Sequence, residues 1–145
     1  MKVAIGSDHH GRDVRAKIIA MLEEDGHEVT DVGSHGEESV DYPDVASPVA
    51  GSVNKGSVDR GILICGSGIG MAIAANKIDG VRAAPCYDEH TAEMCRRHND
   101  ANVLCMSDAT VSAEHNLKIV KTFMTTDFEG GRHQRRVEKI AELEK

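Results

Sequence analysis

The stretch GILICGSGIG, residues 61–70, decides the fold of this chain. An apolar run leads directly into three glycines at alternate positions, a change of pattern typical of a buried strand that turns into a helix. Glycines 66, 68 and 70 allow backbone N–H groups to approach a ligand closely at a helix start. Because ligands bind beyond the carboxyl ends of parallel strands, this stretch predicts both a central strand and the place of a site.

Similar apolar runs recur along the chain and alternate with segments of helical period, the signature of βαβ units around a parallel sheet. We expect five short strands, at residues 2–6, 28–32, 61–65, 81–85 and 102–106. Val14, Ile18 and Leu22 repeat at helical spacing and mark a first helix that Gly26 can end.

Val45, Val49 and Val53 mark a second helix, with Pro43 suited to its first turn. Pro48 should kink or delay that helix. Three more helices are expected at residues 68–77, 88–97 and 112–125. The tail, 132–145, predicts an amphipathic helix that either covers the sheet or docks on a partner subunit. The chain is therefore expected to form one domain, 1–145, with a three-layer α/β/α Rossmann-like fold and a five-stranded parallel sheet.

Composition and charge argue against several classes of function. The 145 residues include 17 Lys and Arg against 24 Asp and Glu, a formal net charge of −7, which argues against nucleic-acid binding. No run of about 18 apolar residues predicts a membrane span, and the apolar start at 1–6 is too short for an export signal. The four cysteines, with no C-x-x-C pair and no zinc-ligand spacing, are expected to be reduced thiols in a cytoplasmic protein without a metal.

Cys65 is the strongest candidate for chemistry. A lone strand-end cysteine is commonly a buried structural thiol, as we expect for Cys86, Cys95 and Cys105. Cys65 differs because it opens onto a glycine-rich helix start, a setting that favours a thiolate base or nucleophile. The loop could instead belong to a dinucleotide-binding fold, but it reads G-x-G-x-G rather than G-x-G-x-x-G and follows the third strand rather than the first.

Basic and histidine residues supply the remaining candidates. Arg132 and Arg136 lie one turn apart at the start of the last helix, where uncompensated cations call for an anion such as phosphate; the alternative is pairing with surface glutamates. His98 ends the fourth helix, at the amino edge of the sheet, so it could reach a Cys65 site only in another subunit. Asp8 and His9 follow the first strand and suit hydrogen bonds to a substrate better than a metal.

At these motifs the sequence resembles the ribose-5-phosphate isomerase B and galactose-6-phosphate isomerase family, most closely its ribose-5-phosphate branch. The resemblance covers nearly the whole chain. It rests on the segments SDH at 7–9, DYP at 41–43, CGSGIG at 65–70, AANK at 74–77, HND at 98–100 and GGRH at 130–133. It implies a homodimer or a dimer of dimers with shared active sites, no cofactor, and interconversion of ribose 5-phosphate and ribulose 5-phosphate in the pentose phosphate pathway.

The resemblance also implies residue roles. Cys65 is the base that moves a proton between C1 and C2 through an enediolate, and His98 of the neighbouring subunit opens the sugar ring. The other implied roles are to hold the enediolate oxygen, to hold the phosphate, to bind a hydroxyl and to assist the reaction. Ser67, Gly66, Gly68, Ile69 and Gly70 hold the enediolate oxygen; His9, Arg132 and Arg136 hold the phosphate; Asn99 holds a hydroxyl or the enediolate; Asp8 and Tyr42 assist.

One departure from the family pattern leaves the substrate open. Many relatives carry a further phosphate-binding arginine after the fifth strand, where this chain has Ala109, and Asp108 beside it adds a negative charge. An isomerase of allose 6-phosphate or galactose 6-phosphate is therefore an alternative. Two noncatalytic alternatives are a flavodoxin-like nucleotide-binding module and a sugar-phosphate sensor that kept the fold.

Overall fold

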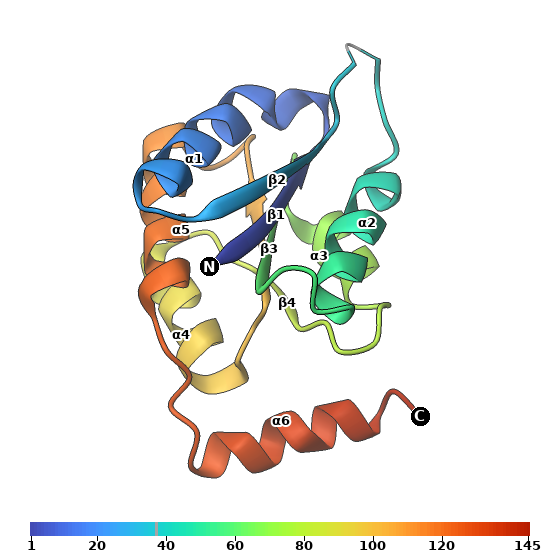
Figure 1. Ribbon diagram of the computed structural model, residues 1–145, viewed down its shortest axis with the longest axis vertical. Helices are drawn as coiled ribbons and strands as arrows, with labels where there is room; N and C mark the ends of the chain where they lie inside the picture. Colours follow the sequence, from blue (N-terminus) through green and yellow to red (C-terminus); the bar gives the residue numbers. More distant parts are fainter. Residues whose placement is uncertain (37) are drawn as a thin grey trace.

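The computed structural model describes residues 1–36 and 38–145 and has a parallel sheet with helices on both faces (Figure 1). The strands are β1 (Lys2–Ser7), β2 (Glu28–Gly33), β3 (Arg60–Cys65), β4 (Ala83–Pro85) and β5 (Val103–Ser107), in the order β2-β1-β3-β5-β4. All pairings are parallel. The predicted three-layer α/β fold with five strands is confirmed.

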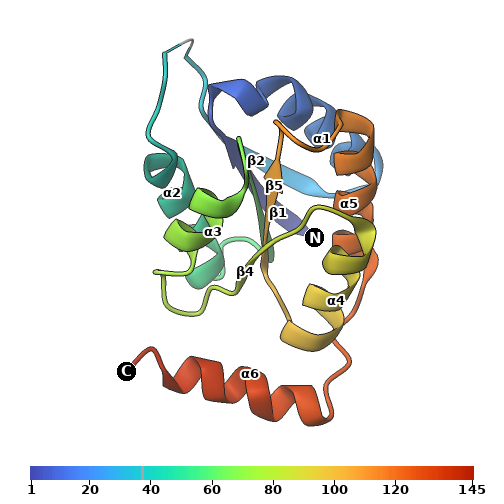
Figure 2. The same cartoon turned by 180° about the vertical axis from the view of Figure 1, so that it is seen from behind.

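The helices divide between the two faces of the sheet. One face carries α1 (Arg12–Glu24), α4 (Glu89–Asn99) and α5 (Ala113–Thr125), and the other carries α2 (Tyr42–Asn54) and α3 (Ile69–Ala75) (Figures 1 and 2). A short 3-10 helix, η1 (His9–Gly11), joins β1 to α1. Among the described residues, no helix combines the length and apolar character needed to cross a lipid bilayer.

The central strands β3 and β5 are buried along their whole length, as expected for strands covered on both faces. Alternate side chains of β3 supply two separate cores. Ile62 and Ile64 pack with α1, α4 and α5, whereas Leu63 and Cys65 pack with α2 and α3. The thiol of Cys65 therefore belongs to the α2 and α3 side, at the last position of its strand.

Helix α2 and strand β4 differ from the sequence predictions. Helix α2 begins at Tyr42 and runs through Pro48 to Asn54, so the expected delay at Pro48 is wrong. A proline removes one helical hydrogen bond, but buried Val45 and Val49 hold this helix against the sheet. Strand β4 begins two residues later than expected, because the backbone of Arg82 bonds to Asn102 before the β4–β5 ladder begins.

The last helix, α6 (Arg132–Glu142), covers neither face of the sheet. It lies across the end where the strands begin, below α4 in Figure 1. A hydrogen bond of 2.8 Å from the Gly80 amide to Glu144 Oε1 fastens the chain just beyond it. Ile140 remains exposed, and Leu143 is 82% exposed. Of the two roles considered for the tail, covering the sheet is wrong.

Candidate active site

The strand order reverses between β1 and β3, so their carboxyl ends lie side by side and leave a crevice between the loops that follow. A cavity of about 490 Å³ opens there. Most of its lining consists of residues that the sequence singled out. The lining residues are Asp8, Tyr42, Cys65, Gly66, Ser67, Ile69, Gly70 and Ile73.

Cys65 contributes its sulfur to this cavity from the end of β3. Its Sγ accepts a hydrogen bond of 3.2 Å from the backbone N–H of Gly68. Gly68 has φ +79°, and a Cβ there would come within 3.1 Å of the Met106 backbone, so only glycine can present the amide in this way. The loop thus places a backbone hydrogen-bond donor on the sulfur.

The other three cysteines lie in the core rather than at the cavity. Cys86 and Cys95 place their sulfurs 3.8 Å apart. Burial raises the pKa of the Cys105 thiol well above its ordinary value. These surroundings agree with the structural role expected of all three.

Ser67 sits at the tip of the glycine loop. Its hydroxyl accepts a hydrogen bond of 3.2 Å from the Ile69 amide. Its carbonyl accepts one of 2.7 Å from the hydroxyl of Tyr87. The sequence did not identify Tyr87, and no local signal could have done so, because the contact joins residues 20 positions apart.

Tyr42 closes the cavity from the first turn of α2. Its ring lies over Gly70, where a Cβ would come within 2.6 Å of the ring atom Cε1. Gly70 is therefore required for the close approach of the ring. Tyr42 itself is largely exposed, so its hydroxyl remains available to a ligand.

On the β1 side, Asp8 lines the cavity, and His9 follows it at the start of η1. The Asp8 carboxylate accepts a hydrogen bond of 3.2 Å from the Gly11 amide and so caps η1. The ring of His9 packs at 3.9 Å from that of His10. The Nδ1 atom of His9 is buried and has no hydrogen-bond partner among the described residues. His9 therefore keeps unused hydrogen-bonding capacity.

The loop after β5 completes this edge. The amide of Asp108 donates to the Cys65 carbonyl at 3.1 Å, and that of Ala109 donates to the Gly66 carbonyl at 3.3 Å. Burial, and after it the charge of Asp8, raise the pKa of Asp108. An acidic side chain thus lies next to Ala109, the position where relatives are expected to carry an arginine, and close to Asp8 and His9.

The other predicted residues lie at the opposite end of the sheet. His98 and Asn99 end α4, five and four residues before β5 begins, and Arg132 and Arg136 project from the first turns of α6. A six-residue strand spans roughly 20 Å, so these side chains are far from the Cys65 of their own chain. The structure therefore separates the predicted residues into a carboxyl-edge group and an amino-edge group.

The amino-edge group includes two residues that the sequence did not assign a role. The ring of His98 stacks on that of His133, with centroids 4.3 Å apart and planes 12° from parallel. Glu129 places a carboxylate oxygen 3.7 Å from His98 Nε2. Burial, followed by the charge of His98, lowers the pKa of His133. His133 is the last residue of the GGRH segment, but its stacking on His98 depends on tertiary structure.

Arg132 and Arg136 are exposed, and within the described ranges no ion pair joins them to an acidic group. Glu138, a surface glutamate on the same helix, instead accepts a hydrogen bond of 3.0 Å from Gln134. Their positive charges are thus available to an external anion.

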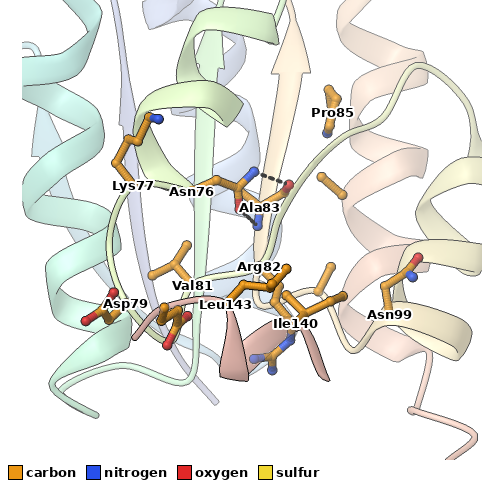
Figure 3. A pocket seen from close by; sticks show the side chains of 13 residues that line it. Asn76, Lys77, Asp79, Val81, Arg82, Ala83, Pro85, Asn99, Ile140 and Leu143 are labelled. Carbon is orange, nitrogen blue, oxygen red and sulfur yellow. Dashed lines mark hydrogen bonds between the residues drawn. The ribbon is translucent and has the colours of Figure 1, made fainter. Parts of the chain in front are cut away.

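A second cavity, of about 600 Å³, lies between α6 and the segment around β4. Figure 3 shows Ile140 and Leu143 facing Val81 across it, with Asn99 at one end. Apolar side chains on an isolated terminal helix are costly to leave in water, so this region is suited to packing against another surface.

Comparison with known proteins identifies the family. The family model described as Ribose/Galactose Isomerase matches residues 3–140. This chain belongs to the ribose/galactose isomerase family. The family resemblance drawn from the motifs is thereby confirmed, and so is the expectation of an isomerase.

Individual members of the ribose/galactose isomerase family are similar over almost their full length. The chain is 47% identical over 143 residues to ribose-5-phosphate isomerase B of Escherichia coli K12, covering 99% of this chain and 96% of that protein. A Clostridium thermocellum ribose-5-phosphate isomerase B structure shares 50% identity with a TM-score of 0.97, covering 99% and 97% of the two chains. The Mycoplasma genitalium enzyme, with bound ribulose-5-phosphate, shares 46% identity with a TM-score of 0.96, covering 99% and 95%.

Proposed function

We propose that this ribose/galactose isomerase interconverts ribose 5-phosphate and ribulose 5-phosphate. The observation that carries the proposal is the placement of the Cys65 sulfur, with a backbone donor on it, in a cavity at the carboxyl edge of the sheet. The ribulose-5-phosphate complex of the Mycoplasma genitalium relative supports a five-carbon substrate.

In this mechanism Cys65 removes a proton from the sugar carbon next to the carbonyl and returns it to the neighbouring carbon. Proton transfer between C1 and C2 passes through an enediolate, whose oxygen carries negative charge. The Gly68 amide assists the thiolate state of Cys65 by donating to its sulfur. Asp8 and Tyr42, which line the same cavity, assist by hydrogen bonding to the sugar.

The glycine loop stabilises the enediolate. The amides of Gly66 and Gly70 and the hydroxyl of Ser67 are the donors left for the oxyanion, because the Gly68 and Ile69 amides already donate to Cys65 Sγ and Ser67 Oγ. One such preorganised donor is worth about 2.7–4 kcal/mol in oxyanion sites. Because Ser67 Oγ accepts its bond from the Ile69 amide, the serine hydroxyl keeps its own proton to donate to the ligand.

The site is shared between two copies of the chain. The sugar ring must open before its carbon acid is exposed, and His98 is the proposed acid–base group for that step. His98 lies at the amino edge, so it acts in the site of the partner, together with Asn99, Arg132 and Arg136. The two arginines and His9 then hold the phosphate in a homodimer or a dimer of dimers, and the exposed face of α6 supplies part of the contact.

The identity of the sugar is the least constrained part of the proposed function. Ala109 supplies no charge after β5, and Asp108 raises the cost of placing a phosphate there. Allose 6-phosphate and galactose 6-phosphate are therefore tested beside ribose 5-phosphate. Ribose 5-phosphate is expected to give the highest kcat/KM, because the HND and GGRH segments typical of the ribose branch are both present.

Proton exchange tests the chemistry directly. Wild-type protein in deuterated buffer should exchange the C2 proton of ribose 5-phosphate, and Cys65→Ala should not. Cys95→Ala is the matched control, because Cys65 and Cys95 are each 7% exposed and only Cys65 lines the cavity. Equal exchange in the wild type and Cys65→Ala would remove Cys65 as the base. A wild type that binds the sugar phosphate without exchange would instead indicate a noncatalytic sensor.

A further inference from the structure

Three side chains at the amino edge, His98, Glu129 and His133, bring one ligand atom each within 4.8 Å of one another. The two oxygens of Glu129 face different partners. Oε2 lies 3.7 Å from His98 Nε2, and Oε1 lies 4.0 Å from His133 Nε2. Two imidazoles and one carboxylate form a donor set that suits zinc and neighbouring divalent transition metals.

His133 gives an independent indication that a ligand is missing. The residue is only 6% exposed. Its Nε2 atom is buried and lacks a hydrogen-bond partner among the residues that the structure describes. Buried polar atoms without partners are uncommon, and this one faces the carboxylate of Glu129 beyond hydrogen-bond distance. An ion between them would satisfy both groups.

Arg97 holds the carboxylate of Glu129 in place. Its Nε donates to Glu129 Oε2 at 2.8 Å, and its carbonyl accepts the Glu129 amide at 3.0 Å. Its Nη1 donates to Glu93 at 3.0 Å, which holds the guanidinium in place. Oε1 of Glu129 stays free for a metal while Oε2 remains bonded. Such outer contacts orient metal ligands and are a normal part of metal sites.

The stacked rings require one movement before they can share an ion. Nearly parallel rings direct their nitrogen lone pairs along parallel lines, so one ring must turn for the lone pairs to converge. His98 is partly exposed and can turn, whereas buried His133 stays in place. The exposed side of Glu129 leaves room for water as a fourth ligand. Nearby Arg97 and Arg132 repel a cation, which makes the site weak and exchangeable.

We propose that His98, Glu129 and His133 bind a divalent transition-metal ion such as Zn²⁺ or Co²⁺, and that the bound ion inhibits the isomerase reaction by capturing His98. The binding step stands on the geometry of these three residues alone. The inhibition rests on the proposed function, because it requires His98 to act on the sugar.

Cobalt spectroscopy tests the binding step without any measurement of activity. Titration of the full-length protein with Co²⁺ should produce d–d absorption that is stronger than that of aqueous Co²⁺ and lacks sulfur-to-cobalt charge-transfer bands, since the ligands are nitrogen and oxygen. His133→Ala and the nearly isosteric Glu129→Gln should each weaken Co²⁺ binding by more than roughly tenfold, because even outer partners of metal ligands change affinity about 10- to 100-fold. His90→Ala, an exposed histidine in the same α4, should bind as the wild type does.

Absence of the absorption in folded wild type, or equal binding by wild type and both variants, would overturn the site. Thiolate charge-transfer bands would overturn it as well, because they would place the ion on a cysteine. Circular dichroism confirms that each variant is folded. If His133→Ala is unfolded, Co²⁺ binding by Glu129→Gln decides whether the site exists.

Zinc inhibition tests the consequence. Zn²⁺ should inhibit wild-type isomerisation reversibly, with recovery on addition of EDTA, and Glu129→Gln should need more than roughly tenfold more Zn²⁺. Equal inhibition of both proteins would refute the capture of His98. If Co²⁺ binds as expected but the metal-free wild type shows no isomerisation, the proposed function fails and the metal site stands.

Discussion

The aromatic ring of Tyr42 lies so close to Gly70 that a Cβ on Gly70 would come within 2.6 Å of the ring carbon Cε1. This contact joins the first turn of α2 to the glycine loop after β3, and both elements line the cavity that holds Cys65. A small residue at position 70 therefore sets the width of the site.

Gly70→Ala should displace the Tyr42 ring and lower kcat/KM by roughly 10- to 100-fold, since misplacement by about 1 Å can cost that much. The backbone of Gly70 is helical, so the alanine adds no strain of its own. Gly51→Ala, where a Cβ meets nothing within 4 Å, is the control and should leave activity unchanged. Steady-state kinetics with ribose 5-phosphate measures the activity of both variants. Normal activity of Gly70→Ala would show that the reaction does not depend on the close approach of the Tyr42 ring to position 70.

Mixing two inactive variants tests the shared site. Cys65→Ala and His98→Ala homodimers should each be inactive, whereas unfolding and refolding them together should restore about a quarter of wild-type activity. Half of randomly mixed dimers contain one copy of each, and each of those has one intact site because the interface is two-fold symmetric. No recovery, with mixed dimers demonstrated by mass spectrometry, would exclude the proposed division of residues between subunits.

Arg132→Ala should raise KM for the sugar phosphate by roughly 10- to 100-fold, the equivalent of about 1.5–3 kcal/mol for a hydrogen bond to a charged group. The dependence of KM on salt should also become weaker, because one charge that attracts the phosphate is lost. Lys118→Ala removes an exposed cation from α5 and serves as the matched control. If KM and its salt dependence are unchanged in Arg132→Ala, Arg132 does not bind the phosphate.

Asp108 should make stability depend on pH. Burial, and then the charge of Asp8, raise its folded-state pKa above the unfolded value of about 3.9. Above the folded-state pKa the carboxylate is charged in both states and destabilises the fold, whereas below about pH 3.9 it is neutral in both and has no effect. Asp108→Asn should therefore raise Tm at neutral pH, and the increase should shrink as pH falls through the folded-state pKa. A difference in Tm independent of pH would contradict this.

Much of the fold could be predicted because its signals are local. The apolar run of β3 and the i, i+4 spacing in α1 each report burial within one element, and the structure has a strand and a helix there. The course of α2 through Pro48 could not be predicted, because the stabilising contacts of Val45 and Val49 are tertiary.

In the candidate site, too, some features could be predicted from the sequence and others depend on tertiary contacts. Asp8 and Cys65 could be placed at one edge because parallel strands bring their carboxyl ends together. The bond from Tyr87 to the Ser67 carbonyl and the stacking of His133 on His98 could not, because each joins segments that only the folded chain brings together. Motifs indicated which residues are candidates for the chemistry, and the structure showed which of them lie together.

The separation of His98 from Cys65 by the length of β3 has a consequence for the enzyme in dilute solution. If the site is shared as proposed, a chain in isolation holds one half of each of two reaction centres, and catalysis is tied to the association equilibrium. Specific activity should therefore fall as the protein is diluted below its dissociation constant, and a saturating sugar phosphate that bridges both halves should pull the chains back together.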